Sequence, residues 1–272
     1  MQSTGLDGWA LVLGASSGFG GTASAAFARA GLNVIGVHLD RRATMPAAEA
    51  VQAQVREAGR EAWFFNVNAA DEGKRRETLD TVRARLQERG GRGGEQRIRV
   101  LLHSLAFGTL KPYWSGESEA NDINKVNMDM TLDVMGHSLV YWTQDVLRRG
   151  LFTEHARLFA MTSAGGTNVW KGYGAVSAAK AALESHIRQL AVELAPQKIT
   201  ANAICAGVTD TPALRKIPGH EEMIQVAKRR NPHKRLTTPD DVASAMVALA
   251  SPATHWITGN TIYVDGGEAI SG

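Results

Sequence analysis

The chain has 272 residues, of which 44% are hydrophobic, so it can bury a full core in one α/β domain. Its 30 basic and 27 acidic residues leave a formal charge of +3, and we expect no nucleic-acid partner. The single cysteine, Cys205, excludes an intramolecular disulfide and a multi-cysteine zinc site, and no histidines have the spacing of metal ligands. No apolar run reaches membrane-spanning length and residues 1–14 do not resemble a signal peptide, so we expect a cytoplasmic protein.

Short apolar runs alternate with longer helical patterns along the chain. The helical patterns cover residues 20–31, 46–59 and 74–90, and the runs predicted as buried strands cover 9–13, 33–38, 62–67, 98–104, 157–163, 199–205 and 261–266. Strands that are apolar on both faces and separated by helices indicate right-handed crossovers in a parallel sheet. The predicted fold is α/β: a Rossmann-type, doubly wound sheet of seven parallel strands in a single domain over residues 1–272.

The alternation lapses between residues 211 and 239, where the charged helical stretch "EEMIQVAKRR" lies. An insertion after the sixth strand falls at the carboxyl edge of the sheet, where ligands bind in this class of fold. We therefore predict a helical substrate lid here.

The first predicted strand is followed by "LVLGASSGFGG", with Gly14, Gly18 and Gly20 in G-x-x-x-G-x-G spacing. Glycines permit a tight turn and bring the backbone close to a pyrophosphate, which the N–H groups of the following helix bind. The loop predicts a dinucleotide site whose remaining members are Ser16, Ser17 and Phe19.

The end of the second strand, "VHLDRR", is where such a site reads the adenosine ribose. His38 stands where an acid would accept from the 2′-hydroxyl of NAD, and Arg41 and Arg42 follow, suited to the 2′-phosphate of NADP. Asp40 opposes this interpretation, since a shift of register would place it near the ribose. We predict NADPH as the cofactor, with NADH as the alternative.

These motifs, with "FNV" (Asn66, Val67), "NAICAG" and "YVDGG", resemble the short-chain dehydrogenase/reductase superfamily over nearly the whole chain. Within it, details resemble the enoyl-acyl-carrier-protein reductases, nearest the FabL-like subgroup. Tyr173 and Lys180 have Y-x6-K spacing where ordinary members have Y-x3-K, and Val176 occupies the ordinary tyrosine position. The turn "HSLAFG" (103–108), the pair Ala206–Gly207 and Met135 also depart from the ordinary pattern in the enoyl-reductase direction.

The resemblance implies further cofactor-binding residues at the ends of the third, fourth and sixth strands and on the helix that follows the fifth. They are Asn66, Val67, Ser104, Leu105, Ala106, Lys180, Ala206, Gly207, Val208, Thr209 and Thr211. It also implies an acyl carrier protein as the partner that presents the substrate, and a homotetramer.

Two departures from the enoyl-reductase pattern concern Leu13, where a threonine is usual, and Ser163, where the better-known members carry a second tyrosine. Ser163 also lies thirteen positions before Val176, where ordinary members keep a catalytic serine. We expect Ser163 to hydrogen-bond the substrate or the tyrosine; the alternative is that it only ends the fifth strand.

Moving the tyrosine from position 176 to 173 displaces it by ~4.5 Å along a helix. In ketone reduction the developing oxyanion is bonded directly to the carbon that receives hydride. In enoyl-thioester reduction hydride goes to Cβ, and negative charge develops on the carbonyl oxygen, two carbons further on. A displaced hydroxyl suits that oxygen. We therefore expect an NADPH-dependent enoyl-thioester reductase in which Tyr173 bonds the enolate oxygen and Lys180 binds the nicotinamide ribose and favours tyrosinate character. The alternatives are a dehydrogenase acting on a ketone or alcohol and a catalytically silent NADP(H)-binding protein.

The predicted lid ends in "AKRRNPHKR", which contains five cationic residues. Such a run is usually a solvated helix end. The functional alternative is that it docks the acidic carrier protein beside the substrate entrance. The five are Lys228, Arg229, Arg230, Lys234 and Arg235.

Overall fold

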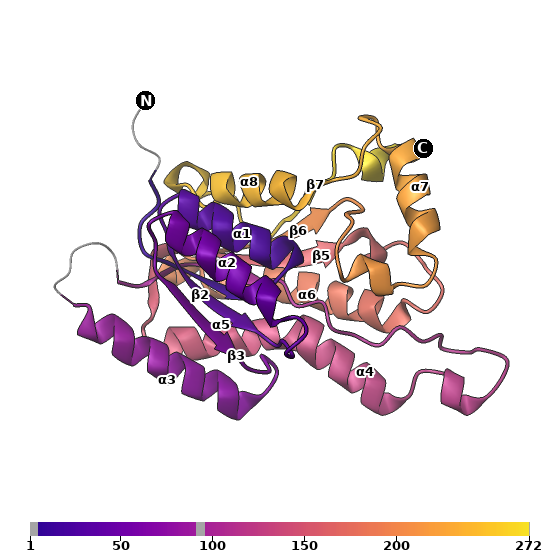
Figure 1. Cartoon of the computed structure of the whole chain (residues 1–272), viewed down its shortest axis with the longest axis horizontal. Helices are drawn as coiled ribbons and strands as arrows, with labels where there is room; N and C mark the ends of the chain where they lie inside the picture. The colour runs from indigo at the N-terminus through magenta and orange to yellow at the C-terminus, as the bar shows by residue number, and fades with distance from the viewer. Residues whose placement is uncertain (1–4, 91–95, 272) are drawn as a thin grey trace.

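A single parallel sheet of seven strands organises the protein, in the order β3-β2-β1-β4-β5-β6-β7 (Figure 1). The structure, a computed structural model, describes residues 5–90 and 96–271, so both ends of the predicted domain lie outside the described residues. The strands are β1 (Trp9–Leu13), β2 (Asn33–His38), β3 (Ala62–Asn66), β4 (Ile98–His103), β5 (Phe152–Ser163), β6 (Thr200–Ala206) and β7 (Thr261–Val264). The predicted fold class is confirmed.

Two layers of helices cover the sheet. In Figure 1, α1, α2 and α8 lie on one face and α3, α5 and α6 on the other. The helices are α1 (Gly18–Arg29), α2 (Met45–Glu57), α3 (Glu72–Glu88), α4 (Lys125–Leu132), α5 (Ser138–Arg148), α6 (Gly174–Glu193), α7 (His220–Arg230) and α8 (Pro239–Leu249). A π-helical turn (Asp133–His137) joins α4 to α5.

The central strands are buried on both faces because their side chains alternate between the two helix layers. In β1, Leu11 and Leu13 belong to the core shared with α3, α5 and α6, whereas Ala10 and Val12 belong to the core shared with α1 and α8. All of β1 is buried. This explains why the strands are read from the sequence as continuous apolar runs.

Helix starts differ in how their backbone N–H groups are satisfied. The Asp71 side chain accepts from Lys74 N at 2.8 Å at the start of α3, and Thr238 and Asp241 form a reciprocal capping box at α8. Ser17 precedes α1 without any such side-chain bond, and the first turn of α1 contains no acidic residue. The start of α1 is therefore available to an anionic ligand.

The chain order reverses between β1 and β4, which are neighbours in the sheet. Loops at the carboxyl ends of these two strands diverge to opposite sides and leave the crevice in which doubly wound folds bind ligands. In Figure 1, α7 stands beyond the ends toward which β5 and β6 point. Residues 211–239, predicted as a lid, contain α7 and a short 3-10 turn at Leu214–Lys216.

Candidate active site

The glycine loop after β1 packs directly on the end of β4. Gly14 has φ +90°, and a Cβ there would lie 2.4 Å from the Ser104 carbonyl oxygen. A Cβ on Gly20 would lie 2.1 Å from the Gly14 carbonyl oxygen. Both positions therefore require glycine for a close backbone approach. A Cβ on Gly18 would lie 3.8 Å from Thr211, so the loop after β6 adjoins the same cradle.

This cradle fits the pyrophosphate of a dinucleotide. Its backbone is held at positive φ at Gly14 and Gly18, and it leads into the uncapped, acid-free N-terminus of α1. Free N–H groups and the partial positive charge of a helix N-terminus bind phosphate oxygens. The predicted residues Gly14, Ser16, Ser17, Gly18, Phe19 and Gly20 occupy this one turn.

The Asp40 carboxylate, just after β2, is hydrogen-bonded to groups of the protein itself. His38 is buried, and its Nδ1 lies 2.9 Å from Asp40 Oδ2. Asp40 N donates to Asn66 Oδ1, and Asn66 Nδ2 donates to Asp40 O, both at 2.9 Å. Burial opposes ionisation, but hydrogen bonds from Thr44, Ser16 and His38 outweigh it, so the pKa of Asp40 is lowered.

The other residues predicted to read the adenosine lie around this carboxylate. Arg41 and Arg42 are exposed on the segment that follows it. Val67 N donates to His38 O at 2.8 Å, which fixes the end of β3 beside the end of β2. The structure therefore brings the residues predicted to read the ribose together at one corner of the crevice, with His38 buried in the protein.

Tyr173 immediately precedes the first turn of α6 and lies beside Ser163 at the end of β5. The phenol and the Ser163 hydroxyl form a hydrogen bond, and Ser163 Oγ also accepts from Gly165 N at 3.0 Å. A Cβ on Gly165 would lie 2.5 Å from the Tyr173 ring, so glycine is required for this contact. Burial raises the pKa of Tyr173, and the bond with Ser163 offsets this only in part, so the phenol is protonated at neutral pH.

Lys180 lies two turns further along α6, and its ammonium donates to Met161 O at 2.7 Å. The side chain is buried, which lowers its pKa to about 8, while the nearby Glu184 carboxylate acts in the opposite direction. Glu184 is itself held by Thr162 Oγ1 at 2.6 Å. The expectation that Lys180 favours a tyrosinate finds no support here, because the phenol pKa is raised and the ammonium is bonded to β5.

The ordinary tyrosine position is filled by an apolar cluster. Val176 and Met135 are both buried and pack with Ala179, Leu110 and Tyr173. A Cβ on Gly108 would lie 2.9 Å from both Val176 Cγ2 and Met135 Sδ. The segment "HSLAFG" therefore lies over these two side chains, and the three departures from the ordinary pattern form one packed unit.

His103 and Cys205 are buried at strand ends near this site, and burial shifts the pKa of each. His103 is fully buried, its Nε2 lies 2.8 Å from Ser138 Oγ, and burial lowers its pKa to about 3, so the ring is neutral. Burial, with nearby carboxylates, raises the pKa of Cys205 to about 12, so it is no nucleophile at neutral pH.

The loop after β6 supplies the remaining predicted cofactor residues. Thr209 Oγ1 donates to Gly207 O at 2.9 Å, and Val208 N donates to the carboxylate of Glu268. The other predicted residues of the fourth-strand end, Leu105 and Ala106, follow Ser104 on the same edge. All predicted site residues thus lie at the carboxyl edge of the sheet.

Sequence reasoning missed two carboxylates at this edge, Glu184 and Glu268. Glu184 follows Lys180 by four positions, and this spacing places the two on one helix face, so it could have been found. The contact of Glu268 with Val208 joins segments 60 residues apart, and no local signal in the sequence indicates it.

The fold, the glycine cradle and the Tyr173–Ser163–Lys180 grouping define a short-chain dehydrogenase/reductase, for which a nicotinamide nucleotide is the expected cofactor. The family model described as enoyl-(acyl carrier protein) reductase matches residues 14–268, and the chain belongs to this family of oxidoreductases.

The chain is similar to reductases with more than one named activity. The enoyl-acyl-carrier-protein reductase (NADH) FabI of Synechocystis sp. is 35% identical over 65% of this chain and 66% of its own. The 1-cyclohexenylcarbonyl-CoA reductase of Streptomyces collinus is 28% identical over 96% of this chain and 86% of its own. Among solved structures, the reductase LugOII, which catalyses keto-reduction at C1 during lugdunomycin biosynthesis, superposes with a TM-score of 0.80 at 26% identity, covering 97% of this chain and 98% of its own.

Within residues 5–90 and 96–271, no helix combines the length and hydropathy needed to cross a lipid bilayer. In the same ranges, no three histidine, cysteine, aspartate or glutamate side chains are grouped to hold a metal ion.

Proposed function

We propose that the protein reduces the 2,3-double bond of an enoyl thioester carried by an acyl carrier protein in fatty-acid synthesis. The observation that carries this proposal is the place of the tyrosine at the start of α6: Val176 occupies the ordinary tyrosine position, and Tyr173 stands three residues earlier. The place of the ordinary tyrosine is closed by Val176, Met135 and Gly108, while a protonated phenol stands one turn earlier beside Ser163. A ketone reductase needs its acid beside the carbon that accepts hydride, and Val176, at the ordinary tyrosine position, has no proton to donate.

Tyr173, Ser163 and Lys180 each have a separate role in the proposed reaction. A bound nicotinamide nucleotide supplies the hydride, which is delivered to Cβ of the thioester. Tyr173 donates a hydrogen bond to the carbonyl oxygen as negative charge develops on it, and Ser163 orients the phenol. Lys180 supplies positive charge at the base of the site, and Cα accepts one proton to complete the reaction.

For the cofactor, we propose NADPH. The Asp40 carboxylate is turned toward His38, Thr44 and Ser16 within the protein, whereas Arg41 and Arg42 are exposed at the same corner. A guanidinium pairs well with a phosphate, and the 2′-phosphate is the group that distinguishes NADPH from NADH. The FabI relative bears NADH in its name, so both nucleotides belong in the assay.

One assay tests the proposed function. Oxidation of NADPH and NADH is followed with a trans-2-enoyl thioester, a 3-oxoacyl thioester and a steroid ketone as substrates. Turnover of the enoyl thioester with NADPH supports the proposal. Turnover of the ketones alone would identify a ketone reductase, and tight nucleotide binding without any turnover would identify a nucleotide-binding protein.

A further inference from the structure

The chain makes a hydrogen-bonded turn after β7, over residues 265–271, that contacts both the loop after β6 and the end of α7. Asp265 Oδ1 accepts from Gly267 N at 2.9 Å, and its Oδ2 accepts from Ala269 N at 2.8 Å. Gly266 and Gly267 both have positive φ, +61° and +85°. Asp265 is buried, so the turn is fixed by its own hydrogen bonds. We call residues 265–271 the C-terminal turn.

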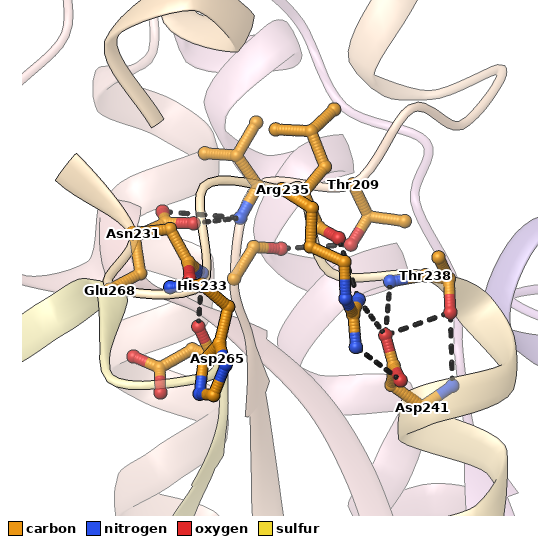
Figure 2. A network of polar contacts seen from close by, with 11 residues as sticks. Thr209, Asn231, His233, Arg235, Thr238, Asp241, Asp265 and Glu268 are labelled. Carbon is orange, nitrogen blue, oxygen red and sulfur yellow. Dashed lines mark hydrogen bonds and ion pairs between the residues drawn. The ribbon is translucent and has the colours of Figure 1, made fainter. Parts of the chain in front are cut away.

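On one side, the C-terminal turn holds the loop that follows β6. Both carboxylate oxygens of Glu268 lie 3.2 Å from Val208 N. Dashed lines in Figure 2 mark the contacts that Glu268 makes here. A Cβ on Gly207 would lie 2.9 Å from Glu268 Oε2 and 2.5 Å from Thr237 Oγ1. Only glycine permits this approach, so the backbone of the loop is shaped to receive the carboxylate.

On its other side, the C-terminal turn holds the end of α7. The Arg230 guanidinium donates to Ala269 O at 3.2 Å and also to Ser271 O. Asn231, which ends α7 and is 2% exposed, donates from Nδ2 to Asp265 O at 2.8 Å (Figure 2). The last turn of the lid helix and the loop after β6 are therefore fastened to the same seven residues.

The pKa of the Glu268 carboxyl is raised above its usual value. Burial raises the pKa of Glu268; the Val208 N–H and Arg230 lower it, and Asp265 raises it. His233 lies against the same turn, 3.3 Å from where a Cβ on Gly266 would stand. Since the backbone N–H of Val208 needs an acceptor, an ionised Glu268 favours the observed loop conformation.

We propose that Glu268 is a positioning residue for the nicotinamide nucleotide: it holds the loop at residues 206–211 in its binding conformation and, through the C-terminal turn, couples that loop to the lid helix α7. The proposal takes from the proposed function only that this loop contacts the cofactor. It is therefore tested by nucleotide binding without substrate, and a wrong assignment of the reduced bond would leave it intact.

The first test measures the Kd of NADPH, and of NADH, for the whole protein by calorimetry. Glu268→Ala removes the acceptor and is expected to weaken binding about tenfold, whereas Glu268→Gln keeps an amide oxygen and is expected to cost less, about threefold. Thermal unfolding is recorded for each variant; if Glu268→Ala does not fold, Glu268→Gln decides. Unchanged Kd values in the folded variants would overturn the proposal.

The second test measures the coupling with a double-mutant cycle. Arg230→Gln is expected to weaken nucleotide binding about threefold alone, and to have little further effect in the Glu268→Gln background. Arg229→Gln, an exposed arginine beside it on α7, is the matched control and should leave Kd unchanged. Fully additive effects of Glu268 and Arg230 would overturn the coupling.

The third test measures nucleotide affinity as a function of pH. A side chain with a merely structural role would give no such pH dependence. Nucleotide affinity of the wild type should weaken as pH falls toward the raised pKa of Glu268, because protonation removes the negative charge and leaves a weaker acceptor for Val208 N. In Glu268→Gln this dependence should be absent. An identical pH profile in the two proteins would count against the proposal.

Discussion

Lys180 and Glu184 stand one helical turn apart on α6 and are each held by a consecutive residue of β5. Met161 O accepts from the Lys180 ammonium, and Thr162 Oγ1 donates to the Glu184 carboxylate. The pair thus fixes the amine at a buried place where burial lowers its pKa to about 8 and Glu184 partly compensates. Burial therefore brings the pKa of Lys180 to about 8, and Glu184 keeps it from falling further.

Replacing Glu184 by Gln should shift the alkaline limb of the kcat profile to lower pH. In the proposed function the ammonium form of Lys180 supplies positive charge at the site, so activity should fall as pH rises through about 8. Removing the carboxylate lowers that pKa further, and activity at pH 8 should fall about twofold while activity at pH 6 is unchanged. Thr162→Val keeps the charge and breaks only the hydrogen bond. An equal shift in both variants would assign the effect to geometry.

Tyr173→Phe should lower kcat by about 100-fold and leave the Kd of the nucleotide unchanged. In the proposed function the hydroxyl donates to the developing oxyanion, and its ring packs on Gly165 in a way that phenylalanine preserves. Stopped-flow measurement of NADPH oxidation with an enoyl thioester checks this. A kcat within a few-fold of the wild type would show that a group other than Tyr173 stabilises the negative charge on the carbonyl oxygen.

Replacing Arg41 and Arg42 together by Ser should reduce kcat/KM for NADPH about tenfold or more and change that for NADH by less than about twofold. The two arginines are exposed where the 2′-phosphate is expected, and NADH lacks this phosphate. Steady-state kinetics with each nucleotide give the ratio. If both nucleotides lose equally, the arginines have no part in selecting the cofactor, and Asp40 becomes the residue to replace.

At the scale of elements, the sequence predicted strands well where both faces are buried and poorly where polar residues intervene. β1 and β2 begin and end as predicted, because every apolar residue in them faces a helix layer. β5 begins at Phe152, five residues before the predicted start. The additional stretch contains Glu154 and His155, and His155 has φ +60°, so neither alternation nor a continuous apolar run marks it.

The contact between "HSLAFG" and α6 shows what local pattern cannot predict. Gly108 lies on Val176 although 68 positions separate them, and it is glycine because the space for a side chain is already occupied. The sequence indicated that Val176, Met135 and "HSLAFG" change together, through their resemblance to enoyl reductases. Their packing into one cluster is a tertiary property that appears only in the fold.

Gly108→Ala should therefore destabilise the protein by about 1–3 kcal/mol and raise the KM for the thioester, because the added methyl group meets Thr131, Met135 and Val176. Adding Val176→Ala should restore part of the stability by making room. Gly73→Ala, in the first turn of α3, is the control and should be neutral or slightly stabilising. Chemical denaturation measures the three variants, and a neutral Gly108→Ala would contradict the proposed close packing.

At the scale of the whole molecule, all five cations of the predicted lid are exposed, and side-chain hydrogen bonds distinguish them from one another. Arg230 is bound to carbonyl oxygens of the C-terminal turn, and Arg235 pairs with both oxygens of Asp241. Lys234 donates to Arg229 O at 3.0 Å. Lys228 and Arg229 project from the exposed face of α7. The sequence predicted one cationic run, but hydrogen bonding leaves these two as the residues best placed to meet a partner.

A docking role for the lid therefore predicts an effect of Lys228 and Arg229 in particular. The double variant Lys228→Glu, Arg229→Glu should raise KM for an enoyl thioester on an acyl carrier protein about fivefold at low ionic strength, and less at high salt. KM for the same acyl group on coenzyme A should change less than about twofold, because coenzyme A presents no acidic protein surface. Nucleotide Kd serves as the check that the lid and the C-terminal turn remain intact, since neither side chain contributes to that contact. Equal rises in KM for both thioesters would place the effect in the substrate cleft and remove the support for docking at this helix.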